Sequence, residues 1–158
     1  MRTVNVPAAW RVSRTTVVAA IGLGLLATYA AGCSSGIPWR GFTFERVHEQ
    51  SRRDHKLTFV YFRHWSVIAC TDFEEDVLED AAVRKATADL YCVPLDFHWD
   101  RTLADEWDVQ EPPAVVILDP RRRVMASRSG AISVKELLEM IESARREFAS
   151  ATQPTSVP

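Results

Sequence analysis

The most chemically suggestive residue of this sequence is Cys70. It follows a short apolar run, 57–62, and a polar loop, and it precedes an acidic segment, 74–78, with helical spacing. A cysteine placed where a strand ends and a helix begins suits thiol chemistry, because free N–H groups and the positive end of the helix dipole favour a thiolate. The acidic residues oppose this effect, since nearby negative charge disfavours a second anion. These residue types therefore point to thiol chemistry at Cys70 and leave its reactivity open.

The chain has two other cysteines, Cys33 and Cys92. In an exported protein a Cys70–Cys92 disulfide is compatible with the compartment. Cys92 lies in the apolar run 90–93, however, and free cysteine is among the residue types most often buried. We favour a buried core position for Cys92 and keep the disulfide as the alternative.

The N-terminal segment, residues 1–32, has the composition of a signal peptide or membrane anchor and is left out of the fold analysis. Arg2, Arg11 and Arg14 form its positive part, and the uncharged stretch 15–31 is at the lower end of the length that spans a bilayer. The small residues Ala30-Ala31-Gly32 stand directly before Cys33 and resemble the lipobox of bacterial lipoproteins, although leucine is usual where Ala30 stands. That resemblance implies cleavage before Cys33 and lipidation of its thiol. An uncleaved anchor and ordinary secretion are the alternatives, and all three export the protein, in the lipoprotein case to the periplasmic side of a bacterial cell envelope.

The remaining chain divides into a tether at 33–42, a domain at 43–149 and a tail at 150–158. Apolar periodicity and capping residues predict an alternation of helices and strands in the domain. His48 and His55 are interpreted as solvated residues of the first helix, and Pro94 favours an edge position for its strand. The predicted helices cover 43–56, 70–79, 81–90, 100–107 and a segment from Ser133, and the predicted strands cover 57–62, 91–97, 114–118 and 123–129.

Strands separated by helices predict an α/β domain with a mostly parallel sheet that is covered on both faces. The Asp119-Pro120 turn adds an antiparallel hairpin at the end of the sheet.

With this order, residues 43–147 resemble the thioredoxin superfamily. The segment 57–62 is similar to the strand before the family's W-C-x-x-C motif, and Cys70 stands where the second cysteine of that motif would be. Phe73-Glu74-Glu75-Asp76-Val77 resembles the M-E-E-E-V pattern of exported relatives, and 96–109 resembles a further family segment. Glu111-Pro112-Pro113-Ala114 is similar to the G-V-P-T turn. The resemblance implies a thioredoxin-like fold, with a central mixed sheet of about four strands flanked by helices on both faces, and a cis-proline at Pro113.

The sequence departs from the family at the nucleophile. An ungapped alignment places Val67 at the first cysteine of the motif, and an alignment with one insertion places Ser66 there. The degenerate motif is Ser66-Val67-Ile68-Ala69-Cys70. Valine cannot attack a disulfide, and serine without an obvious base cannot replace a thiolate.

Two functions follow from this departure. The first is a non-redox binding or accessory protein of the cell envelope, which takes a protein or peptide in the groove beside Pro113 with Trp65 and Trp99 as contacts. Partial burial of these tryptophans under loops is the alternative placement. The second function is a thiol–disulfide oxidoreductase or related thiol enzyme that uses Cys70, with His64 as an assisting group.

Other ligands find little support in the sequence. His64, Cys70 and His98 lack the spacing of a metal site, so we expect no metal and no cofactor. The net charge of −2 gives nucleic acid no electrostatic reason to bind. Arg121-Arg122-Arg123 reads as a solvated hairpin turn rather than a contact with anionic lipid, because three charges are few for such binding.

Overall fold

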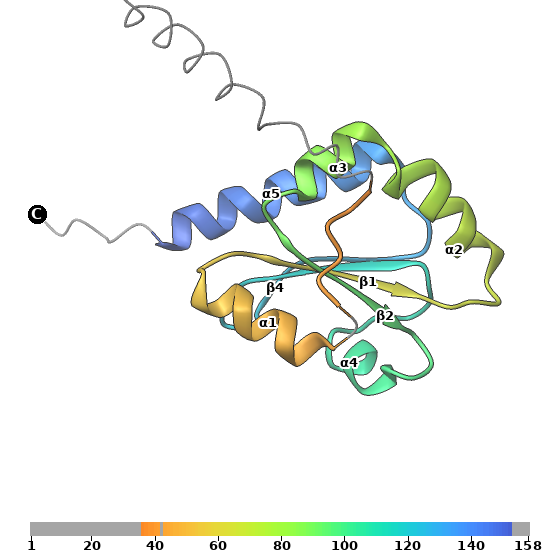
Figure 1. Cartoon of the computed structure of the whole chain (residues 1–158), viewed down its shortest axis with the longest axis horizontal. Helices are drawn as coiled ribbons and strands as arrows, with labels where there is room; N and C mark the ends of the chain where they lie inside the picture. Colours follow the sequence, from red (N-terminus) through yellow and green to blue (C-terminus); the bar gives the residue numbers. More distant parts are fainter. Residues whose placement is uncertain (1–35, 42, 153–158) are drawn as a thin grey trace, which may run out of the picture. The chain divides into compact units, whose positions relative to one another are not determined.

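The computed structural model describes residues 36–41 and 43–152 (Figure 1). The predicted signal, Cys33 and residues 153–158 lie outside the described residues. The elements, in chain order, are α1 (Phe44–Arg53), β1 (Thr58–Arg63), α2 (Ile68–Phe73), the π-helical segment η1 (Glu74–Leu78), α3 (Ala81–Thr87), β2 (Tyr91–Asp96), α4 (Arg101–Glu106), β3 (Ala114–Leu118), β4 (Val124–Ser129) and α5 (Val134–Thr152).

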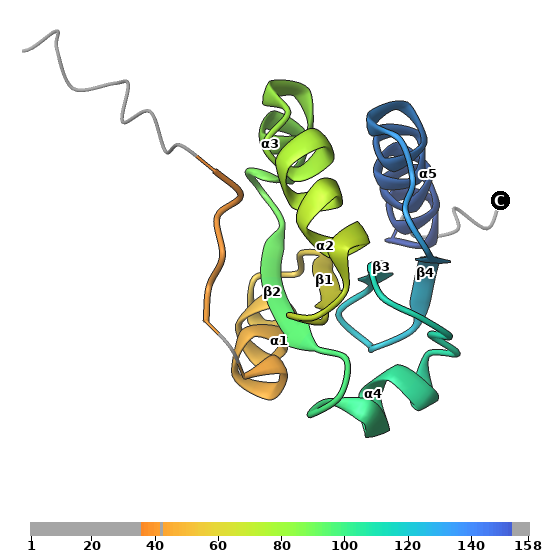
Figure 2. The ribbon, with the colours of Figure 1, turned by 90° about the vertical axis from the view of Figure 1, so that its right-hand side faces the viewer.

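The four strands form one mixed sheet in the order β2-β1-β3-β4, which Figure 2 shows nearly end-on. β1 is parallel to β2 and antiparallel to β3, and β3 is antiparallel to β4. The predicted mixed sheet is confirmed, but the expectation of a mostly parallel sheet is wrong. The chain stays at the carboxyl end of β2 through α4, so β3 begins at that end and runs back along β1.

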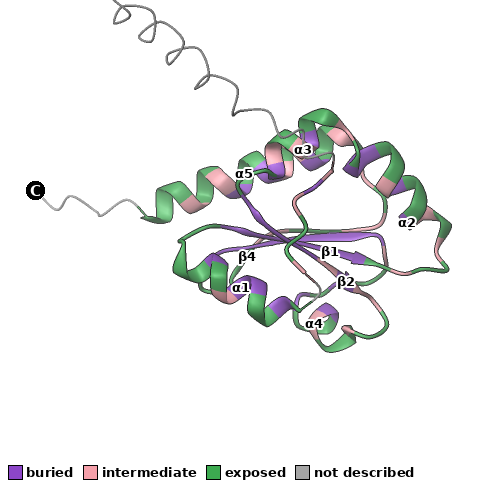
Figure 3. Cartoon of the chain, in the orientation of Figure 1, coloured by how far each residue is buried: buried purple, intermediate pink, exposed green. Residues whose placement is uncertain are grey.

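Helices cover both faces of the sheet, with α1 and α4 on one side and α2, α3 and α5 on the other (Figures 1 and 3). β1 is buried from Thr58 to Phe62, and its side chains alternate between the two cores. Phe59 and Tyr61 pack toward α3 and α5, whereas Val60 and Phe62 pack toward α1 and α4. This alternation follows from the two-residue period of a strand, which requires apolar side chains on both faces when both are covered.

The segment predicted as a tether packs on the domain over residues 36–41. Ile37 is buried in the core, Trp39 forms a parallel bridge with Cys92, and the Arg40 N–H donates to the Cys92 carbonyl at 2.9 Å. We call residues 36–41 the strap. An edge strand has unpaired backbone groups, and the strap covers part of the β2 edge that also contains Pro94. At the other end of the domain α5 continues to Thr152, so the predicted boundary at 149 falls inside this helix.

Two helix starts have the predicted caps. The Asp80 carboxylate accepts the Ala82 N–H at 2.7 Å at the start of α3. Ser133 and Glu136 form a reciprocal capping box, in which the Ser133 N–H donates to Glu136 at 2.8 Å and the Glu136 N–H donates to Ser133 at 3.3 Å.

The prediction of a solvated His48 is wrong. His48 lies four residues after Phe44, on the inward face of α1, where the two rings stack at 5.1 Å. Its Nδ1 is 3.1 Å from the Thr58 Oγ1 of β1, and burial lowers the pKa of its imidazole. His55 is exposed and lies after the end of α1.

Among residues 36–41 and 43–152, no helix combines the length and the apolar character that a membrane span requires.

Candidate functional site

Cys70 lies inside the domain although its loop is at the surface. The loop between β1 and α2 begins at His64, and Val67 is the N-cap residue of α2. The Cys70 side chain is 2% exposed, and its sulfur accepts the His64 N–H at 3.4 Å. A helix makes one turn in 3.6 residues, so Cys70 and Phe73 share the face that packs on the sheet. The thiol is therefore part of the packing between α2 and β1.

The other residues of the motif are exposed or half-buried. Ser66 is exposed, Val67 and Ala69 are half-buried, and the Ile68 side chain is 79% exposed. The exposed positions of the motif therefore carry a hydroxyl and a sec-butyl side chain, and neither can form a mixed disulfide.

Ser66 has a base beside it, which sequence reasoning missed. Its Oγ lies 2.9 Å from the His64 Nδ1, and its N–H donates to the same nitrogen at 3.4 Å. Among the described residues, no carboxylate is hydrogen-bonded to His64 to orient it. The pair therefore lacks the third group that activates a serine nucleophile, and it closes the turn between β1 and α2.

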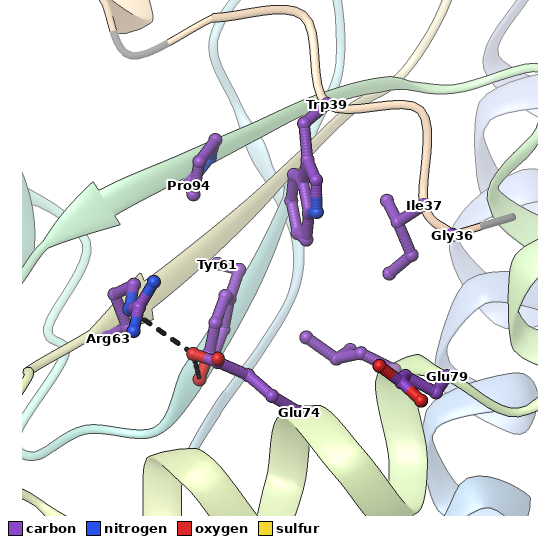
Figure 4. Close-up of a pocket in the computed structure, with 9 residues that line it drawn as sticks. Gly36, Ile37, Trp39, Tyr61, Arg63, Glu74, Glu79 and Pro94 are labelled. Atoms are coloured by element: carbon purple, nitrogen blue, oxygen red, sulfur yellow. Dashed lines mark hydrogen bonds and ion pairs between the residues drawn. The ribbon is translucent and has the colours of Figure 1, made fainter.

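A polar network joins the start of η1 to β1 (Figure 4). The Tyr61 hydroxyl donates to Glu74 Oε1 at 3.1 Å and lies 3.3 Å from the Cys70 carbonyl, and Arg63 Nε reaches the same Glu74 oxygen at 3.2 Å. Burial, followed by the charge of Glu74, raises the pKa of Tyr61, so the hydroxyl stays a neutral donor. This network fixes the helical segment on the central strand. Sequence analysis missed it, although a tyrosine inside a buried apolar run signals a need for a partner.

The peptide bond between Pro112 and Pro113 is cis, as the resemblance implies for this turn. Ala114 pairs with Phe62, so the antiparallel register places Pro113 level with Arg63, where the loop to α2 starts. Pro113 is buried. The cis-proline turn therefore lies at the same end of the sheet as the degenerate motif.

Trp65 and Trp99 are exposed rather than covered by loops. Their side chains are 80% and 82% exposed, and Ile68 adds a third large apolar group. His64 stacks beside Trp65 at 5.9 Å between ring centroids, and His98 lies 6.4 Å from His64 and 5.1 Å from Trp99. The rings thus connect the loop after β1 with the loop after β2. We call Trp65, Ile68 and Trp99, with His64 and His98 between them, the aromatic patch.

The predicted core position of Cys92 is confirmed, and the alternative Cys70–Cys92 disulfide does not form, because both cysteines are free and buried. Cys92 pairs with Phe59, whereas the Cys70 sulfur contacts His64, five residues further along the chain. At about 3.3 Å per strand residue these positions are roughly 16 Å apart, well beyond the span of a disulfide. Burial raises the pKa of Cys92 to about 12, so this thiol is a core residue. Within the described part of the chain, no three His, Cys, Asp or Glu side chains converge on a position for a metal ion.

Solved structures with the same architecture include several proteins of thiol–disulfide chemistry. A thioredoxin from Thermus thermophilus aligns with a TM-score of 0.64 and 16% identity, over 75% of this chain and 94% of that chain. A putative disulphide-isomerase from Bacteroides thetaiotaomicron aligns with a TM-score of 0.59 and 19% identity, over 70% and 94% of the two chains. The DsbH oxidoreductase aligns with a TM-score of 0.58 and 17% identity, over 70% and 85%.

No protein-family model matches the chain, and no curated protein matches it. Identities below 20% to these solved structures establish the architecture and leave the activity to the residues of this chain.

The burial of Cys70 makes a prediction for its reactivity. In the Ile68→Cys variant of the full chain, kept in a non-ionic detergent, iodoacetamide should modify position 68 quickly and Cys70 about a hundredfold more slowly. That factor corresponds to a local opening free energy of about 2.8 kcal/mol. Mass spectrometry of the labelled peptide reports both sites in one molecule. Labelling in urea, where both sites should react alike, is the control, and equal rates in the native protein would contradict the buried position.

Proposed function

We propose that this chain, which has the thioredoxin fold, is a binding protein that does not exchange disulfides, and that it holds an extended peptide or protein segment on the aromatic patch. The observation that carries the proposal is the inversion of the motif. The only cysteine of the motif faces inward, and apolar and hydroxyl side chains occupy its outward positions.

Disulfide exchange needs an exposed thiolate that attacks and a second thiol that resolves the mixed disulfide. Cys70 is 2% exposed, and its sulfur already accepts a backbone hydrogen bond. Cys92 is buried on β2 opposite Phe59, far from the Cys70 sulfur near His64, and cannot resolve a disulfide at Cys70. Neither step of the exchange has a residue to perform it among the described cysteines.

The aromatic patch supports binding. Exposed tryptophan side chains supply much of the energy at protein interfaces, because they bury a large area with little loss of side-chain entropy. Three large apolar side chains lie here at the end of the sheet where the cis-proline turn also lies. The loops after β1 and β2 present the two tryptophans, with the histidine rings between them, and Ile68 is the first residue of α2. Such a surface suits contact with apolar side chains of a partner peptide, whose backbone would lie against the two loops.

The alternative is a thiol enzyme that uses Cys70. It is favoured by the similarity in architecture to an oxidoreductase and to a putative disulphide-isomerase. It requires α2 to open far enough to expose the sulfur, which the hydrogen bond from His64 and the Tyr61–Glu74–Arg63 network oppose.

We further propose that the domain is exported and held at a membrane through lipid on Cys33, on the periplasmic side of a bacterial cell envelope. The support is the sequence before the domain: three arginines, an uncharged stretch and small residues directly before Cys33. A lipid on Cys33 would begin only a few residues before the strap, so the domain would be close to the membrane surface.

Reduction of insulin by dithiothreitol tests the absence of exchange chemistry. The full chain should leave the uncatalysed rate unchanged, and Cys70→Ser should behave like the parent. Val67→Cys should accelerate the reaction, because it places a thiol at the N-cap of α2, three residues before Cys70. Val67→Ser is its matched control without a thiol. Catalysis by the parent that Cys70→Ser removes would overturn the proposal.

An array of short synthetic peptides with apolar residues at alternate positions tests the binding surface. We expect Trp65→Ala and Trp99→Ala each to weaken the retained peptides about tenfold, which is the loss typical of a truncated interface tryptophan. Val124→Ala is the control, because Val124 is also exposed but pairs with Leu118 at the opposite end of the sheet. Equal retention by all three variants would mean that the patch does not hold the peptides.

Growth of a bacterial host with an alkyne-labelled fatty acid tests the anchor. The full chain should take up the label, and Cys33→Ala should lose it, since the thiol that accepts the diacylglyceryl group is gone. Cys92→Ala is the control, because Cys92 is a buried core residue. Label that persists in Cys33→Ala would contradict lipidation at this residue.

A further inference from the structure

A pocket of about 300 Å³ lies between the strap and η1, over β1 and the edge strand β2 (Figure 4). The function proposed above does not use it. Its walls come from segments far apart in the sequence: Ile37 and Trp39 from the strap, Tyr61 from β1 and Leu78 from η1. A concave site with apolar walls and a few polar groups has the general form of a site for a small ligand.

Two aromatic rings form much of the wall. The Trp39 indole lies 6.1 Å from the Tyr61 ring, with 31° between the planes, and 6.4 Å from Phe59. The bridge from Trp39 to Cys92 and the hydrogen bond from Arg40 hold the indole over the sheet. Trp39 is nevertheless 40% exposed, so part of its ring is free to contact a ligand.

The π-helical geometry of η1 brings two carboxylates to the pocket. The Glu79 N–H donates to the Glu74 carbonyl at 3.1 Å, an i→i+5 bond. In a regular α-helix residues five apart point about 140° from each other, whereas the wider π turn brings them toward one side. Glu74 and Glu79 both line the pocket as a result (Figure 4).

The charges of the pocket do not cancel. Arg63 forms an ion pair with Glu74, which also accepts the Tyr61 hydroxyl. Glu79 lines the same pocket, and within residues 36–41 and 43–152 no cation is paired with its carboxylate. The lining therefore has one uncompensated negative charge in the same pocket as the partly exposed Trp39 indole.

We propose that this pocket binds an organic ammonium group. An ammonium over the partly exposed Trp39 indole is attracted by the quadrupole of the ring, and Glu79 supplies the counter-charge. The methylenes or methyl groups beside the nitrogen contact Ile37 and Leu78. The same chemistry is found in a small free amine and in a lysine side chain of a peptide. This site is separate from the aromatic patch and does not depend on the function proposed for it.

Ligand-observed NMR on the full chain in a non-ionic detergent tests the proposal with two matched pairs of probes. Choline is compared with dimethylbutanol, its neutral isostere, and a capped Gly-Lys-Gly peptide is compared with the same peptide acetylated on the lysine. We expect the charged member of at least one pair to bind and its neutral partner to bind at least tenfold more weakly. Choline binding identifies a free amine as the ligand class, and binding of the peptide alone identifies a lysine side chain.

Variants assign the binding to the pocket. Glu79→Gln should weaken the charged probe about tenfold, and Trp39→Leu should weaken it as well. Glu75→Gln is the matched control, because Glu75 is an exposed carboxylate of η1, four residues before Glu79, and does not line the pocket. The proposal is overturned if neither charged probe binds, if the neutral probes bind equally well, or if Glu79→Gln and Glu75→Gln have the same effect.

Discussion

Burial of β1 on both faces and along both edges is the constraint on which the rest of this structure depends. The strand pairs with β2 on one side and β3 on the other, and its side chains from Thr58 to Phe62 are removed from water. Apolar side chains must therefore point to both faces, and each polar group there needs a partner. Tyr61 meets this requirement through Glu74, and Thr58 through His48. These two contacts attach η1 and α1 to the central strand, and so they position the helices on the two faces.

The same constraint explains the arrangement of residues 66–70, the segment that resembles a degenerate redox motif. α2 begins five residues after the end of β1, and its inward face, with Cys70 and Phe73, packs on the sheet. A thiol at this inward position contributes as a small apolar side chain and accepts the backbone N–H of His64. The outward positions are free of packing constraints, and here they carry Ser66 and Ile68. The outward positions thus present a hydroxyl and an apolar side chain to solvent.

Local patterns predicted the parts of the fold that depend on neighbours in the chain. The Ser133–Glu136 capping box and the Asp80 cap involve residues at most three apart, and both form as expected. The buried strands at 58–63 and 114–118 follow from runs of apolar residues, and the edge position of β2 follows from Pro94. The direction of β3 was harder to predict, because it depends on which end of the sheet the connection through α4 occupies. His48 was misread for a related reason: its polarity suggested water, but its place four residues after Phe44 put it on the inward face of α1.

By itself the sequence determined the order of elements, the thioredoxin-like architecture and the presence of a single cysteine in the segment 66–70. Each of these is set by residue type or by spacing along the chain. Only the tertiary structure decided that Trp65 and Trp99 are exposed, that Ser66 has His64 as a neighbour and that Cys70 and Cys92 are far apart. It also shows that residues 36–41, predicted as part of a tether, pack on the domain as a strap, and that a pocket lies between this strap and η1. These features depend on contacts between segments tens of residues apart, and the free energy of such contacts is fixed by packing geometry that a one-dimensional pattern does not contain.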